Sequence, residues 1–136
     1  MSFNKIIGLT IIYLALNLSV LADANAASFS VKCQAVRDRS SSKIVVRGTG
    51  LRGKYYVKVF SGGNTKQSEE KLTPDNGVVD FKFDSDLAYV NAGAIAIPPD
   101  FIKKRRVVGV IRKAGTHARI GGVISICKVK QPPPLP

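Results

Sequence analysis

From residue 28 onward, apolar and polar side chains alternate with a period of two. The clearest stretches are SFSVKCQA (28–35), KIVVRG (43–48), KYYVKVF (54–60) and VVDFKFD (78–84). Successive side chains of a β-strand point to opposite faces of its sheet, so this period predicts strands with one buried face. Three apolar runs are typical of strands buried on one or both faces: AIAI (94–97), VVGVI (107–111) and VISICKV (123–129).

Turn-forming segments such as PDNG (74–77) and AGT (114–116) separate these strands. No stretch has a convincing helical period; SDLAYVNAG (85–93) is the nearest, and we expect at most one helical turn there. About seven short strands predict an all-β fold, a single antiparallel β-sandwich, with a small barrel as the alternative. In architecture alone this resembles immunoglobulin- and fibronectin-like modules, although the chain has no Trp for their usual core.

The first 26 residues have the order of a secretory signal peptide. Lys5 supplies a positive charge, residues 6–22 are almost wholly apolar, and Ala-x-Ala sites follow at 22–24 and 24–26. We expect cleavage and export to the periplasm or the extracellular space. An uncleaved membrane anchor is the alternative, because the apolar segment reaches the lower end of the spanning range of ~17–25 residues.

Beyond this signal peptide (1–26) we expect one β-sandwich domain at 27–130 and a Pro-rich disordered tail at 131–136. Two cysteines, Cys33 and Cys127, lie near the ends of the domain. An even pair in an oxidising compartment predicts a disulfide, which would staple the first strand to the last. A metal pair or a reactive thiol is the alternative, but a metal needs more ligands than the chain's single histidine adds.

The formal net charge of +12 is unevenly distributed. Residues 69–86 hold six acidic and two basic residues, a net charge of 2 − 6 = −4. Cations gather instead in two clusters further along the chain. The first is Lys103, Lys104, Arg105 and Arg106, and the second is Arg112, Lys113, His117 and Arg119.

In a strand, residues 103–106 would bury two cations without an acidic partner nearby, at a prohibitive cost. They are therefore expected in an exposed turn before the strand at 107–111. The second cluster should lie roughly 20 Å away, at the other end of that strand. Because charges are screened over about 8 Å, the two clusters act as separate sites unless the ligand is long.

We expect no enzymatic activity, no cofactor and no metal. No nucleophile motif accompanies His117, which should be a solvated surface residue. Asp80, Asp84 and Asp86 could offer oxygens to calcium, but their spacing is not that of an EF-hand. The segment GTGLRGKYY (48–56) lacks the ending of a phosphate-binding loop and is interpreted as a hairpin turn.

The sequence therefore predicts an exported, non-enzymatic binding module that contacts a polyanion through residues 103–106. The candidate ligands are lipopolysaccharide, an acidic glycan or anionic lipid. Sequence-specific nucleic acid binding is not expected, since aromatic platforms are lacking beside the cations. Membrane contact is expected only through residues 6–22, if they are kept. Solvated loop cations are the plainest alternative.

A second hypothesis is a structural or assembly module. Such a module would dock on another envelope or secreted protein through a sheet edge or charge-complementary ends.

Overall fold

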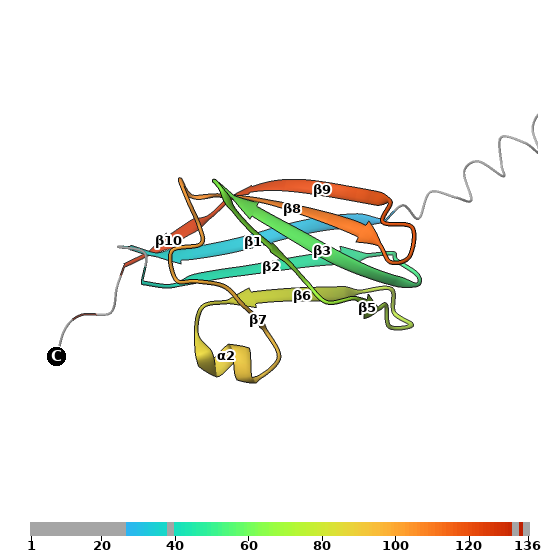
Figure 1. Cartoon of the computed structure of the whole chain (residues 1–136), viewed down its shortest axis with the longest axis horizontal. Coiled ribbons are helices and arrows are strands. Elements are labelled where there is room, and N and C mark those ends of the chain that lie inside the picture. The colour runs from blue at the N-terminus through green and yellow to red at the C-terminus, as the bar shows by residue number, and fades with distance from the viewer. Residues whose placement is uncertain (1–26, 38–39, 132–133, 135–136) are drawn as a thin grey trace, which may run out of the picture.

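The computed structural model describes residues 27–37, 40–131 and 134, and these form ten strands and one short helix (Figure 1). In chain order they are β1 (Ser28–Val36), β2 (Ser42–Thr49), β3 (Lys54–Ser61), β4 (Asn64–Gln67), β5 (Lys71–Leu72), β6 (Val79–Asp84), α2 (Leu87–Asn91), β7 (Ile95–Ala96), β8 (Arg106–Lys113), β9 (Arg119–Ile126) and β10 (Lys128–Lys130). The predicted all-β fold is confirmed. The predicted signal peptide and most of the predicted tail lie outside the described residues.

The strands form two sheets. Sheet A has the order β10-β1-β2-β6-β7, and sheet B has the order β4-β3-β8-β9, with β5 paired to β3. The long strands pair antiparallel, whereas the short strands β10 and β7 pair parallel with β1 and β6. An antiparallel arrangement thus describes the long strands and not every pairing.

One core lies between the sheets. The buried side chains come from both of them: Val31, Ile44, Val46, Phe81 and Phe83 from sheet A, and Tyr55, Val57, Val59, Val107 and Ile111 from sheet B. The sheets approach closely at Gly109 of β8, where an added Cβ would lie 2.7 Å from Val31 Cγ2 of β1. The alternation in the sequence is therefore the pattern that builds this core.

The Cys33–Cys127 disulfide is present, with the two Cα atoms 4.7 Å apart. Cys33 belongs to β1, and Cys127 separates β9 from β10, where the chain passes from sheet B into sheet A. The bridge thus joins the first strand to the crossing point between the sheets, and both cysteines are buried. This prediction is confirmed, although Cys127 interrupts the strand predicted at 123–129.

Two further expectations need correction. The segment 50–53 joins β2 of sheet A to β3 of sheet B, so the hairpin interpretation of 48–56 is wrong. Only Ile95–Ala96 of the predicted strand 94–97 pairs as a strand. The single helical turn expected near residue 85 is confirmed as α2, which the Asp86 carboxylate caps by accepting the N–H of Ala88. In the described part of the chain, no helix has the length and apolar character needed to cross a bilayer.

Candidate anion-binding site

Residues 103–106, here called the cationic turn, form a tight reversal immediately before β8. The N–H of Arg106 donates to the carbonyl of Lys103 at 3.1 Å, while Lys104 and Arg105 have φ angles of 51° and 57°. Such left-handed angles are common for Gly and Asn and unfavourable for Lys and Arg. The two residues therefore suit the turn poorly as backbone, but they carry two cations to its tip.

Three contacts hold the cationic turn in place. The buried hydroxyl of Ser61 accepts the N–H of Lys103 at 2.7 Å and donates to the carbonyl of Arg106 at 2.7 Å. The N–H of Cys127 donates to the carbonyl of Arg105, also at 2.7 Å. Figure 1 shows the resulting position of the cationic turn, beside the turn between β3 and β4. The tip is thus fixed by backbone contacts that do not involve its own charged groups.

The four side chains of the cationic turn differ in exposure. Lys103 packs against Gly62, its side chain keeps 29% of its exposed surface, and its Nζ lies 3.5 Å from Asp100 Oδ2. Lys104, Arg105 and Arg106 are exposed, and Arg105 Nη2 lies 3.5 Å from the carbonyl of Cys127. Three of the four predicted site residues therefore present charge to solvent, whereas Lys103 mainly anchors the turn.

The antiparallel register of β8 and β9 brings further residues to the cationic turn. Ile126 lies opposite Arg106, and Lys128 follows just beyond the Cys127 that bonds to Arg105. A groove of about 410 Å³ opens where β9 passes into β10. Its lining includes Lys32, Lys43, Val45, Ile126 and Lys128, beside Cys33 of the disulfide. We call this region the seam.

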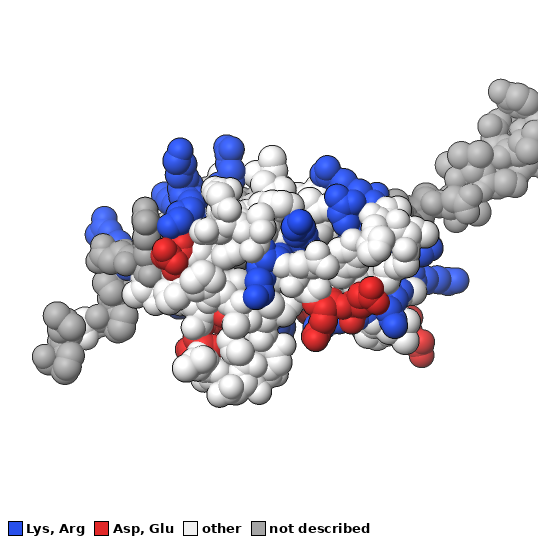
Figure 2. Space-filling view, in the orientation of Figure 1, with Lys and Arg blue, Asp and Glu red and all other residues white. Residues whose placement is uncertain are grey.

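The sequence reasoning missed the seam because it did not pair the strands. One signal was available: from residue 101 to the end, the sequence contains no Asp or Glu, while it contains nine Lys and Arg residues. Cations on β8, β9 and β10 therefore gather without local neutralisation. In Figure 2 the upper rim of the molecule, over β8 and β9, shows Lys and Arg but no Asp or Glu, which lie lower.

The second cluster is partly committed to the hairpin between β8 and β9. The Tyr56 hydroxyl lies 2.8 Å from His117 Nδ1, and Arg112 Nη1 donates to the carbonyl of His117 at 2.9 Å. His117 is therefore a hairpin-fixing residue, contrary to the expectation of a merely solvated side chain. Arg119 folds back over Gly122, where an added Cβ would lie 2.5 Å from its Nη2.

This position of Arg119 shortens the distance between the two clusters. Gly122 is opposite Val110, four residues along β8 from Arg106, which corresponds to roughly 13 Å. Lys113 remains exposed at the end of β8. The two clusters are thus closer on the outer face of sheet B than their places in the sequence indicate.

The acidic residues considered as calcium ligands have structural partners. Asp80 accepts hydrogen bonds from Arg47 at 2.7 and 2.9 Å, and these bonds hold the pKa of Asp80 below its ordinary value. Asp84 is buried and accepts the N–H of Asp86, which in turn caps α2. Among the described residues, no cluster of three or more His, Cys, Asp or Glu side chains could hold a metal ion.

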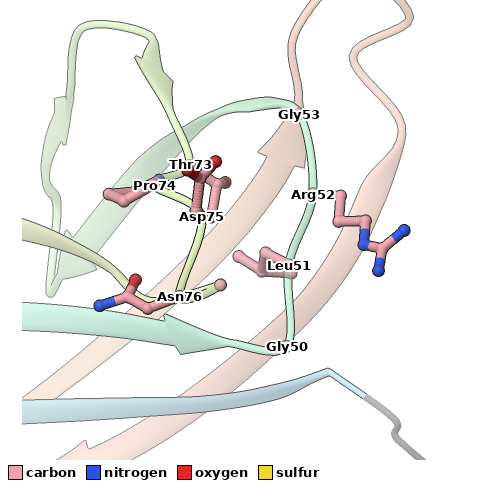
Figure 3. A pocket seen from close by; sticks show the side chains of 9 residues that line it. Gly50, Leu51, Arg52, Gly53, Thr73, Pro74, Asp75 and Asn76 are labelled. Carbon is pink, nitrogen blue, oxygen red and sulfur yellow. The ribbon is translucent and has the colours of Figure 1, made fainter.

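A larger hollow, of about 880 Å³, lies between the loops 50–53 and 73–77 (Figure 3). Backbone hydrogen bonds connect these loops: Leu51 N–H donates to Gly77 O at 3.1 Å, and Thr73 N–H donates to Gly53 O at 2.8 Å. In Figure 3 the Arg52 side chain points away from the hollow. The hollow is therefore shaped by backbone and does not gather the cations that a polyanion requires.

Comparisons of the chain with protein-family models, with curated proteins and with solved structures found no match.

Proposed function

We propose that this protein is a non-enzymatic module that binds an anionic surface or polymer through the cationic turn. The observation that carries the proposal is the display of Lys104, Arg105 and Arg106 on a rigid, exposed tip with Lys128 close by. Lys and Arg are unfavourable at two of these positions as backbone. A residue choice that costs stability and concentrates charge is the pattern of a binding site.

The electrostatics of the tip favour an external anion. Asp100 is the acid nearest in sequence, and it pairs with Lys103 and leaves the other three cations to solvent. The acidic stretch supplies charge elsewhere, at Asp80 on β6 and around α2. Neighbouring cations without counterions attract a polyanion more strongly than a single small anion, because several contacts form at once.

We propose the same finer assignment of fold and location as the sequence predicts. The chain from 27 to 130 would be one sandwich of the immunoglobulin- or fibronectin-like architecture, supported by two sheets that share a core. Export, with residues 1–26 as a cleaved signal peptide, is supported by a disulfide that suits an oxidising compartment. Intact-mass analysis of the protein recovered after export tests the cleavage.

A salt-gradient elution from immobilised heparin, and from immobilised lipopolysaccharide, tests the function. The variant replaces Lys104, Arg105 and Arg106 by Gln. Its matched control replaces Arg52, Lys54 and Lys82, which are exposed and lie off the cationic turn, so both proteins lose three charges. Arg52 and Lys54 lie at the end of β3 remote from Ser61.

We expect the turn variant to elute at much lower salt than the control. Each lost contact should reduce the slope of log affinity against log salt by about 0.7–0.9, the value known for phosphate contacts. Equal elution of the two variants would show that net charge alone governs retention. Docking on a protein through a sheet edge would then be the better hypothesis.

A further inference from the structure

Two isoleucines on β9 are exposed beside the cationic turn. Ile124 and Ile126 each keep 64% of their surface exposed, although β9 packs its other face on the core. They are two positions apart in one strand, so they point to the same side. An adjacent pair of such exposed isoleucines has no role in the interior of the domain.

The strand register extends this apolar pair across sheet B. Val108 lies opposite Ile124, and Phe60 lies opposite Val108, so the three side chains form a row on the outer face. Val108 and Phe60 are half-buried, which leaves the two isoleucines as the most prominent part of the row.

Cations surround this row. Arg106 is opposite Ile126, and Lys58 of the next row places its Nζ 5.5 Å from the centre of the Phe60 ring. Arg119 covers Gly122, the residue two positions before Ile124. On the other side of Ile126, the seam groove contributes Lys32 and Lys128. The surface therefore combines an apolar centre with a cationic border.

We propose that the seam binds the surface of a lipid bilayer that contains anionic headgroups. Ile124 and Ile126 enter the boundary between headgroups and acyl chains, while the cationic turn and Lys128 contact the headgroups. This inference rests on the proposed anion-binding function and names its ligand class. It also goes beyond the sequence-based expectation, in which membrane contact was limited to residues 6–22.

The chemistry of the surface favours a bilayer over a protein partner. Protein interfaces concentrate their binding energy in Tyr, Trp and Arg at a well-packed centre. Here the centre is aliphatic, and the aromatic ring of its row, Phe60, is half-buried and next to Lys58. Flexible cations around exposed aliphatic side chains match an interface with anionic lipid, where burial of apolar groups and attraction to headgroups add.

Co-sedimentation with vesicles tests this inference. Vesicles of phosphatidylcholine alone are compared with vesicles containing phosphatidylglycerol, and the disulfide-bonded protein is produced from the full sequence. The variant Ile124→Thr/Ile126→Thr keeps β-branched residues in the strand. The control Leu72→Thr/Leu87→Thr removes two side chains that are 70% and 73% exposed elsewhere.

We expect binding to the anionic vesicles, with the isoleucine variant weakened about tenfold to hundredfold and the leucine control unchanged. Heparin elution of the isoleucine variant should equal that of the unmodified protein. Equal vesicle binding by both variants would overturn the lipid inference and leave the polyanion proposal intact. Loss of the cationic turn without effect on heparin elution would instead refute the proposed function.

Self-association is measured on the same proteins by sedimentation velocity. A monomer in every case supports the proposal. A dimer that the isoleucine substitutions dissociate would overturn it, because Ile124 and Ile126 would then belong to an interface between two copies of the chain.

Discussion

Replacing the tip of the cationic turn by the sequence best suited to its backbone should raise stability and remove binding together. The substitution is Lys104→Asn/Arg105→Gly. Both residues have left-handed φ angles, 51° and 57°, and their contacts to Ser61 and Cys127 are made by backbone atoms of neighbouring positions or by the carbonyl of residue 105. Asn-Gly is the preferred pair for this geometry and preserves those contacts.

The magnitude follows from the backbone. A left-handed conformation costs an L-residue roughly 1–2 kcal/mol relative to Gly, and Asn tolerates it better than Lys does. The added flexibility of Gly in the unfolded chain offsets about 0.5–1 kcal/mol of that gain. The free energy of unfolding should therefore rise by about 1 kcal/mol, which corresponds to roughly 4–8 °C in midpoint for a domain of this size.

Urea denaturation followed by far-UV circular dichroism gives the stability, and heparin elution gives the binding. The control Lys104→Gln/Arg105→Gln removes the same charges without relieving the backbone, so its stability should match that of the unmodified protein. Its elution should match that of the Asn-Gly variant. If the Asn-Gly variant is less stable than the unmodified protein, the two cations are structural and the reasoning fails.

Three further predictions concern the scaffold. Reducing the Cys33–Cys127 disulfide, which spans a sequence separation of 94, should lower the free energy of unfolding by about 4–5 kcal/mol on the chain-entropy model, measured by urea denaturation with and without reductant; a loss below about 1 kcal/mol would contradict it. Gly109→Ala should cost about 1–3 kcal/mol because its Cβ would lie 2.7 Å from Val31 Cγ2, whereas Gly63→Ala, with nothing within 4 Å, should change stability by less than about 0.5 kcal/mol; equal effects would refute the close packing. Asp80→Asn should destabilise at neutral pH, and its difference from the unmodified protein should vanish as the pH falls below about 4, since a carboxylate with a lowered pKa stabilises only while it is ionised; a constant difference across pH would exclude the Arg47 contact as its cause.

The sequence predicted the elements whose exposure alternates and missed those whose exposure does not. In β2 and β6 the apolar positions alternate with exposed or half-buried ones, which is the signal that period-two analysis detects. The edge strand β4 has the sequence NTKQ and is largely exposed, so it carries no such signal. The start of β9 was missed for another reason: Gly121 is small because Phe29 packs where its side chain would be.

The candidate site was predictable as far as local chemistry determines it. The cost of burying unpaired cations places residues 103–106 in a turn without any knowledge of the fold. The pairing of Lys103 with Asp100, the arrival of Lys128 and the exposure of Ile126 depend on strand register, which one sequence does not specify. Register decides which distant residues become neighbours, and here it turns a basic loop into an amphipathic surface.

The most direct test of the central claim is a nuclear magnetic resonance titration. Backbone amide signals of the ¹⁵N-labelled, disulfide-bonded protein are followed while a heparin-derived oligosaccharide is added at physiological salt. The proposal predicts saturable shifts that are largest at residues 104–106 and 126–130. Largest shifts at the loops 50–53 and 73–77, or at the second cluster around 112–119, would contradict it, as would weak shifts spread evenly over all exposed lysines and arginines.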